Sequence, residues 1–329
     1  MTLSFNQRLF VFLILAVCLS AIPISMFVHR GEGDRQEDED GSSLHSLLDM
    51  KDRILVVKLT GMIADKGDSS LLSRIGTSDS AKKKLHKAVK NKHVKAVLIR
   101  INSPGGTVAS SQELAEEVRL LRKAGKPVVV SMGDVAASGG YYVACAADKI
   151  VASPGTMTGS IGVIMNLINL QGIEQKLGIE PQVVKSGQFK DMGSPHRAMT
   201  PEEKTLIQIM ILDSYDQFVH AVADGRRMEI DTVKKLADGR VYTGRQALKA
   251  GLIDELGSYQ DALASTQKLA RDRYGLKKDL AVDEGEGLGF LSILLESAAA
   301  RIAPDSFLGG ALPESMRGDF QKIPLWMMQ

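Results

Sequence analysis

The chain has 329 residues, of which 44% are hydrophobic and 24% are charged, so it can bury at least one substantial core. Its 41 lysines and arginines nearly balance its 39 aspartates and glutamates, and only 5% of its residues are aromatic. This composition argues against nucleic acid as a partner, because binding to nucleic acid depends on a basic surface.

The first feature along the chain is an apolar stretch over residues 9–28, which follows a short N-terminal flank, residues 1–8. About 20 apolar residues are enough to cross a bilayer core of roughly 30 Å as a helix. We therefore expect one transmembrane anchor. A cleaved signal peptide is the alternative, but its apolar region is usually shorter, about 7 to 15 residues, and no clean small-x-small cleavage site follows. A lipoprotein signal ending at Cys18 is disfavoured because Val17 is bulky.

The charges that flank this stretch do not decide its orientation. Arg8 and the amino terminus lie on one side, and Arg30 and Arg35 lie on the other. Residues 29–50 are polar and rich in acidic side chains, so they are expected to stay solvated as a tether.

From Arg53 onward, short apolar runs rich in Val and Ile alternate with amphipathic stretches, which is typical of βαβ units. Near-continuous apolar strands predict a sheet that helices cover on both faces. We therefore expect one α/β domain over residues 51–282. The predicted strands are 54–59, 96–101, 127–132, 149–152 and 181–185. The predicted helices are 81–90, 110–123, 140–147, 167–177 and 201–223.

Two remaining features are interpreted as structural. Residues 283–329 are richer in Gly and Pro and carry an apolar stripe, so they are predicted to be a docking tail that packs on the domain or on a neighbouring subunit. A membrane-surface element is the alternative for this tail. Cys18 lies inside the apolar stretch, which excludes a disulfide framework and leaves Cys145 as a small buried hydrophobic residue.

Three glycine-containing loops each follow an apolar strand, at places where backbone can approach another group closely. They are Ile-Asn-Ser-Pro-Gly-Gly at 101–106, Ala-Ala-Ser-Gly-Gly at 136–140 and Thr-Gly-Ser-Ile-Gly at 158–162. In an open α/β sheet such loops line the crevice at the carboxyl ends of the strands. The three loops are therefore expected to form one site.

Ser138 is the candidate nucleophile, because the glycines that follow it allow a sharp turn between strand and helix that presents its hydroxyl. The backbone N–H groups of Gly139 and Gly105 could hold a developing oxyanion, a role worth about 3 to 4 kcal/mol per donor. For Ser138 alone, a plain helix N-cap in a glycine turn is the structural alternative. The combination of the three loops favours acyl-transfer chemistry.

A serine nucleophile requires a base, and histidine, the usual base, is poorly placed along this chain. His196 is the only histidine in a plausible loop, and the Gly-x-Ser-x-Gly elbow is missing because Ala136 takes the place of its first glycine. Lys190, in a glycine-containing turn, is the remaining candidate. A lysine that acts as a base near neutral pH needs a pKa about three units below its usual 10.4, which burial in an apolar cleft can supply. The Ser160 hydroxyl is expected to orient this amine.

With the segment Lys-Ser-Gly-Gln-Phe-Lys at 185–190, these loops resemble, in the same order, the motifs of the signal peptide peptidase A family of serine proteases. The resemblance spans residues 54–256. It implies a fold related to the Clp protease and crotonase group, built from repeated ββα and βαβ units and preceded by one transmembrane helix.

By position, the resemblance makes Ser138 the nucleophile and Lys190 the base. It makes Gly105 and Gly139 the oxyanion donors and Ser160 the residue that positions the lysine. These assignments agree with the roles that we infer from the residues themselves.

The resemblance also implies a membrane-anchored serine endopeptidase that degrades signal peptides left in the bilayer and other extended apolar peptides. A chain with one copy of the domain resembles the short forms of the family, which assemble as homo-oligomers. In those assemblies the serine and the lysine can meet across a subunit boundary. The family further implies a catalytic domain on the outer side of the cytoplasmic membrane.

No cofactor or metal is expected. No spacing of histidines and carboxylates suggests a zinc site, and the segment Pro-Gly-Gly-Thr at 104–107 lacks the Gly-Lys-Ser/Thr ending of a phosphate-binding loop.

Two other functional classes remain open. A crotonase-type acyl-thioester hydrolase or hydratase would share the fold and the glycine oxyanion hole, but the anchor and Lys190 argue against it. A non-catalytic membrane scaffold would bind peptides without cutting them, and the presence of both Ser138 and Lys190 argues against that.

Overall fold

The computed structural model describes residues 51–65 and 78–284. The chain divides into two compact units, residues 1–50 and 51–329, and all the described residues belong to the second. The predicted flank, anchor and tether, and the tail beyond residue 284, lie outside the described residues. The domain boundaries therefore stay predictions. Within the described ranges, no helix is long and apolar enough to cross a membrane.

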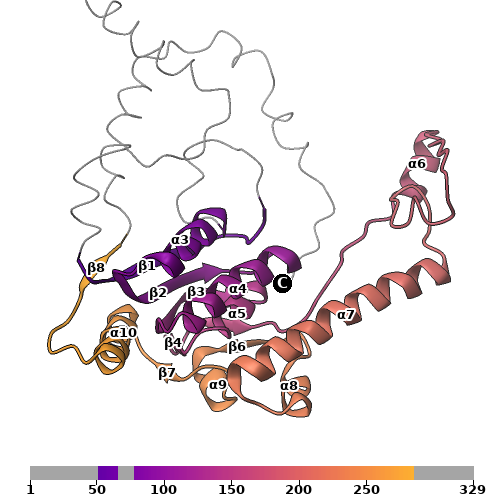
Figure 1. Cartoon of the computed structure of the whole chain (residues 1–329). Coiled ribbons are helices and arrows are strands. Elements are labelled where there is room, and N and C mark those ends of the chain that lie inside the picture. The colour runs from indigo at the N-terminus through magenta and orange to yellow at the C-terminus, as the bar shows by residue number, and fades with distance from the viewer. Residues whose placement is uncertain (1–50, 66–77, 285–329) are drawn as a thin grey trace, which may run out of the picture. The chain divides into compact units, whose positions relative to one another are not determined.

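The described residues form the predicted α/β fold, and their sheet has eight strands where five were predicted (Figure 1). Its strands are β1 (Arg53–Thr60), β2 (Val94–Ser103), β3 (Val128–Ala137), β4 (Lys149–Ala152), β5 (Met157–Gly159), β6 (Val241–Thr243), β7 (Glu255–Leu256) and β8 (Ala281–Asp283). Along the sheet the order is β6-β5-β3-β2-β1-β8, while β4 pairs with both β3 and β7. The pairing of β5 with β6 is antiparallel, and the other pairings are parallel.

Helices cover both faces of this sheet. The helices of the described residues are α3 (Ser78–Lys90), α4 (Val108–Lys123), α5 (Gly139–Ala144), α6 (Gln171–Leu177), α7 (Pro201–Arg226), α8 (Ile230–Leu236), α9 (Gly244–Lys249) and α10 (Tyr259–Tyr274), and all but α6 lie near the sheet. Successive side chains of a strand point to opposite faces. Accordingly, Val56 of β1 packs in one core cluster with Ala262 of α10, whereas Val57 belongs to the larger cluster that contains α3, α4 and α5. The prediction of a sheet covered on both faces is confirmed.

Most predicted elements are confirmed to within a few residues, but the strand predicted at 181–185 is wrong. These residues pair with no strand within residues 51–65 and 78–284, and the Val184 side chain is 99% exposed. Two adjacent valines fit a buried strand by composition, yet a strand needs a neighbour to pair its backbone N–H and C=O groups. The helix predicted at 167–177 is shorter and begins only at Gln171. In contrast, β3 runs to Ala137 and therefore ends directly before Ser138.

The ladder between β2 and β3 is irregular near the loops at 101–106 and 136–140. The register shifts between Ile101 and Ser103. At this point the Asn102 side-chain oxygen accepts a hydrogen bond from the Val135 N–H, at 3.1 Å. A Cβ on Gly133 would lie 3.0 Å from the Asn102 side chain. The glycine thus leaves room for the Asn102 side chain at the point where the register shifts.

Helix α7 is anchored to the domain only by its C-terminal half. It begins with a capping box between Thr200 and Glu203. Its buried apolar residues lie between 218 and 223, and the Phe218 ring lies 5.0 Å, centroid to centroid, from the Tyr142 ring of α5. In its first half, by contrast, the Ile209 side chain is 58% exposed. The contact between Phe218 and Tyr142 thus joins α7 to the helix that follows Ser138.

Replacing Phe218 with alanine should lower the free energy of unfolding by about 3–5 kcal/mol, because it removes a fully buried aromatic ring and leaves a cavity. Ile209→Ala, on the exposed half of the same helix, is the matched control and should change stability by less than about 0.5 kcal/mol. Chemical denaturation of both variants measures the difference. Equal losses would contradict this account of how α7 is held.

Candidate active site

Ser138 occupies the junction between β3 and α5 in a backbone conformation that non-glycine residues rarely adopt. Its φ is 53° and its ψ is −121°. Its side chain is fully buried, and Oγ has no hydrogen-bond partner within the described residues. A buried hydroxyl left unpaired costs about 1–3 kcal/mol. This position therefore works against stability, which is typical of a residue retained for chemistry.

Gly139, the first residue of α5, lies against the loop at 101–106. A Cβ on Gly139 would lie 2.3 Å from Ser111 Oγ and 3.1 Å from the Gly106 nitrogen. A Cβ on Gly106 would lie 1.7 Å from the carbonyl oxygen of Ile63. No side chain fits at either position: Gly139 has to be a glycine for its backbone to approach Gly106, and Gly106 for its backbone to approach Ile63.

The structure favours Gly106 over Gly105 as the partner of Gly139 in an oxyanion hole. The Gly105 N–H donates to Ser103 Oγ at 3.1 Å. In the described part of the chain, the Gly106 N–H makes no hydrogen bond and thus stays available to a ligand. The sequence reasoning missed Gly106, although the second glycine of the pair was the signal that could have found it.

Ser160 lies beside the candidate nucleophile. The Ser138 N–H donates to the carbonyl of Gly159 at 2.8 Å, and Ser160 follows directly. Ser160 is 3% exposed, has a φ of 50°, and donates its N–H to the Arg240 carbonyl at 2.9 Å. Among the predicted site residues, the fold thus gathers Ser138, Gly139 and Ser160 at the ends of β3 and β5.

Lys190 is not brought to Ser138 within one chain, because no group pairs with the Ser138 hydroxyl among the described residues. Lys190 is exposed and belongs to a segment that we call the arm, residues 165–200. Figure 1 shows α6, which is part of the arm, at the N-terminal end of α7 and away from the sheet. The turn that carries Lys190 is held to the first turn of α7, where Gln188 donates to Glu202 at 3.0 Å.

His196, the alternative base, is also on the arm. Its Nδ1 lies 2.6 Å from Oε1 of Glu174 in α6, and Glu174 is 9% exposed. Such a carboxylate can orient an imidazole for proton transfer. The other described histidines are paired with carboxylates at sites that do not include Ser138: His86 with Glu117, His93 with Asp52, and His220 with Asp216.

Cys145 is excluded as a nucleophile by its surroundings. It is fully buried, and burial raises the pKa of its thiol to about 12. A thiol that stays protonated is a poor nucleophile. The prediction that Cys145 is a small packed hydrophobic residue is confirmed.

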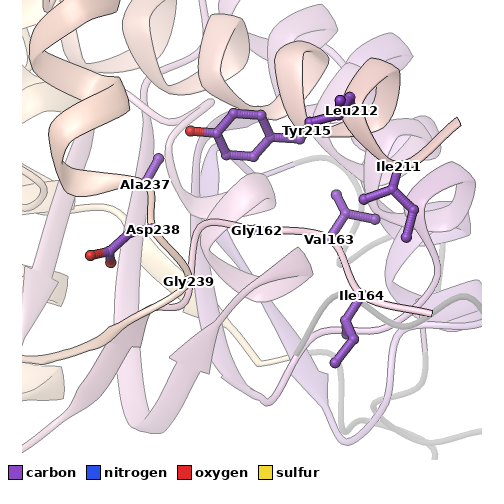
Figure 2. A pocket seen from close by; sticks show the side chains of 9 residues that line it. All are labelled: Gly162, Val163, Ile164, Ile211, Leu212, Tyr215, Ala237, Asp238 and Gly239. Carbon is purple, nitrogen blue, oxygen red and sulfur yellow. The ribbon is translucent and has the colours of Figure 1, made fainter. Parts of the chain in front are cut away.

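A pocket of about 380 Å³ opens two residues beyond Ser160 (Figure 2). Val163 and Ile164 line one side of it, and Leu212 and Tyr215 of α7 line another. Its acidic residue, Asp238, pairs with Arg240, which lowers the pKa of this carboxyl to about 2. The lining suits an apolar side chain. The complete lining is Gly162, Val163, Ile164, Ile211, Leu212, Tyr215, Ala237, Asp238 and Gly239.

No residue of this site is assigned to a metal or cofactor. In residues 51–65 and 78–284, no three His, Cys, Asp or Glu side chains converge to hold a metal ion. The chemistry that these residues offer consists of a hydroxyl nucleophile, backbone N–H donors and a base on the arm.

Comparison with known proteins places the chain among peptidases. Residues 120–272 match peptidase family S49. A protein of Enterococcus faecium named putative signal peptide peptidase SppA is 43% identical over 217 residues, which cover 66% of this chain and 63% of that protein. A putative protease of Synechocystis is 44% identical over 210 residues, which cover 64% of this chain and 72% of that protein. Protease 4 of Salmonella typhi is 37% identical over 229 residues, or 70% of this chain and 36% of that protein.

The matched region is thus shorter than some of these relatives, at 63% of the first and 36% of the last. Among solved structures, a mutant chain described as a "1510-N membrane-bound stomatin-specific protease" aligns with 71% of this chain and 97% of its own length. Its TM-score is 0.42 and its identity is 15%.

Ser138→Ala should raise the free energy of unfolding by about 1 kcal/mol, because it removes a buried hydroxyl that has no partner among the described residues. Ser111→Ala is the matched control. Ser111 Oγ donates to the Thr107 carbonyl at 2.8 Å, so its removal should destabilise by a similar amount. Denaturant titration of both variants gives the sign of each change, and a destabilised Ser138→Ala would contradict the cost assigned to this hydroxyl.

Gly106→Ala should abolish labelling of Ser138 by a serine-directed phosphonate and should cost about 1–3 kcal/mol of stability, because its Cβ would collide with Ile63. Gly155→Ala provides the control, since a Cβ there meets nothing within 4 Å. Labelling is read by mass spectrometry and stability by thermal unfolding. A Gly106→Ala protein labelled at the normal rate would exclude this loop from the site.

Proposed function

The chain belongs to peptidase family S49, and we propose that it is a membrane-anchored serine endopeptidase that degrades remnant signal peptides and other extended apolar peptides. Membership of this family indicates a serine protease. The observation that carries the proposal is the buried, unpaired hydroxyl of Ser138, which lies at a strained turn beside the backbones of Gly106 and Gly139. Because this hydroxyl has no hydrogen-bond partner among the described residues, it is free to pair with a base or a substrate that lies outside them.

In the proposed reaction, Lys190 removes the proton of Ser138 Oγ as this oxygen attacks the scissile carbonyl. The N–H groups of Gly139 and Gly106 hold the oxyanion of the tetrahedral intermediate, and the protonated lysine then gives its proton to the leaving amine. Lys190 next deprotonates a water that attacks the acyl-enzyme. This step releases the carboxylic acid and restores the serine hydroxyl.

We further propose that Lys190 is supplied by the arm of a neighbouring copy in a homo-oligomer. Two observations support this arrangement: Ser138 has no partner within its own described chain, and Lys190 is exposed on the arm. Exposed apolar side chains on the arm and on the first half of α7 also favour contact with another protein surface. These side chains include Ile168, Ile173, Leu177, Val183, Val184, Ile209 and Leu212.

Substrate preference and location follow from separate features. The apolar pocket beyond Ser160 is proposed to bind an apolar side chain of the peptide, with Ser160 orienting the lysine amine. Residues 9–28 are proposed to anchor the chain, so that signal peptides left in the bilayer lie near the site. The catalytic domain is proposed to lie on the outer side of the cytoplasmic membrane.

A second mechanism is favoured by one observation, the 2.6 Å contact between His196 and Glu174. In this alternative, His196 of the arm replaces Lys190 as the base and Glu174 orients the imidazole. The two mechanisms make opposite predictions for the same pair of variants.

We expect Ser138→Ala and Lys190→Ala each to reduce cleavage of a fluorogenic apolar peptide by at least about 1,000-fold, because each removes half of the proposed dyad. His196→Ala should retain activity within about tenfold. The assays use the full chain in detergent, and size-exclusion chromatography checks that each variant keeps the wild-type oligomer.

Cleavage that survives Lys190→Ala but not His196→Ala would move the base to His196. An inactive wild type that a phosphonate fails to label at Ser138 would support a scaffold. Binding of a coenzyme A thioester would instead support a crotonase-type acyl-thioester hydrolase or hydratase.

A further inference from the structure

The carboxylate that directly follows Lys190 in the chain is fully engaged by other cations. Arg197 donates two parallel hydrogen bonds to the Asp191 carboxylate, from Nε to Oδ2 at 2.9 Å and from Nη2 to Oδ1 at 2.8 Å. Lys185 Nζ adds a third, to Oδ1 at 2.7 Å. The Asp191 side chain is only 11% exposed. Although Asp191 is the sequence neighbour of Lys190, its carboxylate thus pairs with Arg197 and Lys185.

Arg197 also connects this turn to the start of α7. It donates to both carboxylate oxygens of Glu203, with Nη1 lying 2.8 Å from Oε2. Glu203, whose side chain is 2% exposed, in turn accepts from the Thr200 N–H at 2.8 Å. One guanidinium therefore bridges the turn that bears Lys190 and the capped end of a long helix, a use to which its planar fork is well suited.

Both carboxylates stay ionised at neutral pH. The hydrogen bonds from Arg197, followed by those from Lys185, hold the pKa of Asp191 well below its usual range. The hydrogen bond from Arg197, followed by that from the Thr200 N–H, lowers the pKa of Glu203 to about 2. The ion pairs therefore persist at neutral pH.

A carboxylate released beside Lys190 would oppose its proposed chemistry. A nearby negative charge favours the ammonium form of a lysine, whereas a general base must be neutral. The flexible stem of a lysine would let its amine reach a carboxylate on the adjacent residue. Arg197 prevents this outcome without removing the acid from the turn, because it donates the hydrogen bond to Asp191 Oδ2, whereas Oδ1 is also held by Lys185.

We propose that Arg197 is a positioning residue for Lys190, which holds Asp191 away from the lysine amine and fixes the turn on the start of α7. This inference rests on the proposed function, in which Lys190 is the base. The charged groups placed around the turn are Lys185 and Asp191 on the turn itself, Arg197 on the following loop, and Glu202 and Glu203 on α7.

The test measures the protonation of Lys190 in two independent ways on the full chain in detergent. One is the pH dependence of kcat/KM for peptide cleavage. The other is the pH dependence of acetylation of the Lys190 amine by acetic anhydride, read by mass spectrometry, which also works on inactive variants.

We expect Arg197→Met to lower kcat/KM at pH 7 by about tenfold and to move both profiles about one unit to higher pH, since a tenfold change in the neutral fraction equals one unit. The double variant Asp191→Asn with Arg197→Met should return both profiles to the wild-type position, because the freed carboxylate is gone. Arg197→Lys keeps the cation and should keep the wild-type midpoint. Arg271→Met breaks the ion pair between Arg271 of α10 and Asp279, and serves as the matched control, with no shift expected.

Loss of activity in Arg197→Met without a shift in either profile would reduce Arg197 to a structural residue and overturn the inference. So would a double variant that stays shifted. If Arg197→Met does not fold, the single variant Asp191→Asn is measured instead. A midpoint of the Lys190 pH profiles above the wild-type value in that variant would contradict the proposed role of Asp191. If the Lys190→Ala variant still cleaves peptide, Lys190 is not the base, and both the proposed mechanism and this inference are wrong. An inactive Lys190→Ala beside an unshifted Arg197→Met would overturn only the inference.

Discussion

The buried hydroxyl of Ser138 is the constraint that organises the site. It lies in a strained conformation, and no other described residue pairs with it. The packing of the surrounding residues offsets the free-energy cost of this strain and of the unpaired hydroxyl. Ser138 lies between the end of β3 and the first turn of α5, and α5 is packed through Tyr141, whose hydroxyl donates to the Leu252 carbonyl at 2.8 Å, and through the contact of Tyr142 with Phe218. Rigid packing of this kind can hold a residue in a conformation that it would otherwise leave.

The same constraint explains why the nucleophile and the proposed base are carried by such different parts of the chain. Ser138 belongs to the fully buried end of the sheet, whereas Lys190 lies on an arm whose hydrogen bonds run within it and to the first turn of α7. A base that arrives from another copy would make activity depend on assembly. An isolated chain would then carry a nucleophile that cannot be deprotonated, which would restrain peptide cleavage before the oligomer forms.

The sequence predicted the parts of the fold that follow from local pattern. Strands β1, β2 and β4 and helices α3 and α4 were predicted correctly because their apolar periodicity reflects burial in one domain. Helix α7 was predicted from its start, where a proline is followed by two glutamates. The prediction of a strand at 181–185 was wrong because its valines lie on the arm, where none of the described strands pairs with them. Gly106 was not singled out because the sequence does not show that the N–H of Gly105 is already used, by Ser103 Oγ. The hydrogen bonds between Arg197 and Asp191 could not be predicted either, because these side chains are six residues apart and only the folded turn brings them together.

The central claim, a site completed by Ser138 of one copy and Lys190 of another, is tested most directly by mixing two inactive proteins. Ser138→Ala and Lys190→Ala chains are combined in equal amounts, dissociated, reassembled and assayed for peptide cleavage. If the dyad forms between copies, random assembly gives about a quarter of the sites an intact serine and an intact lysine, and activity should recover to about a quarter of the wild-type value. No recovery in oligomers shown by mass spectrometry to contain both chains would contradict the claim.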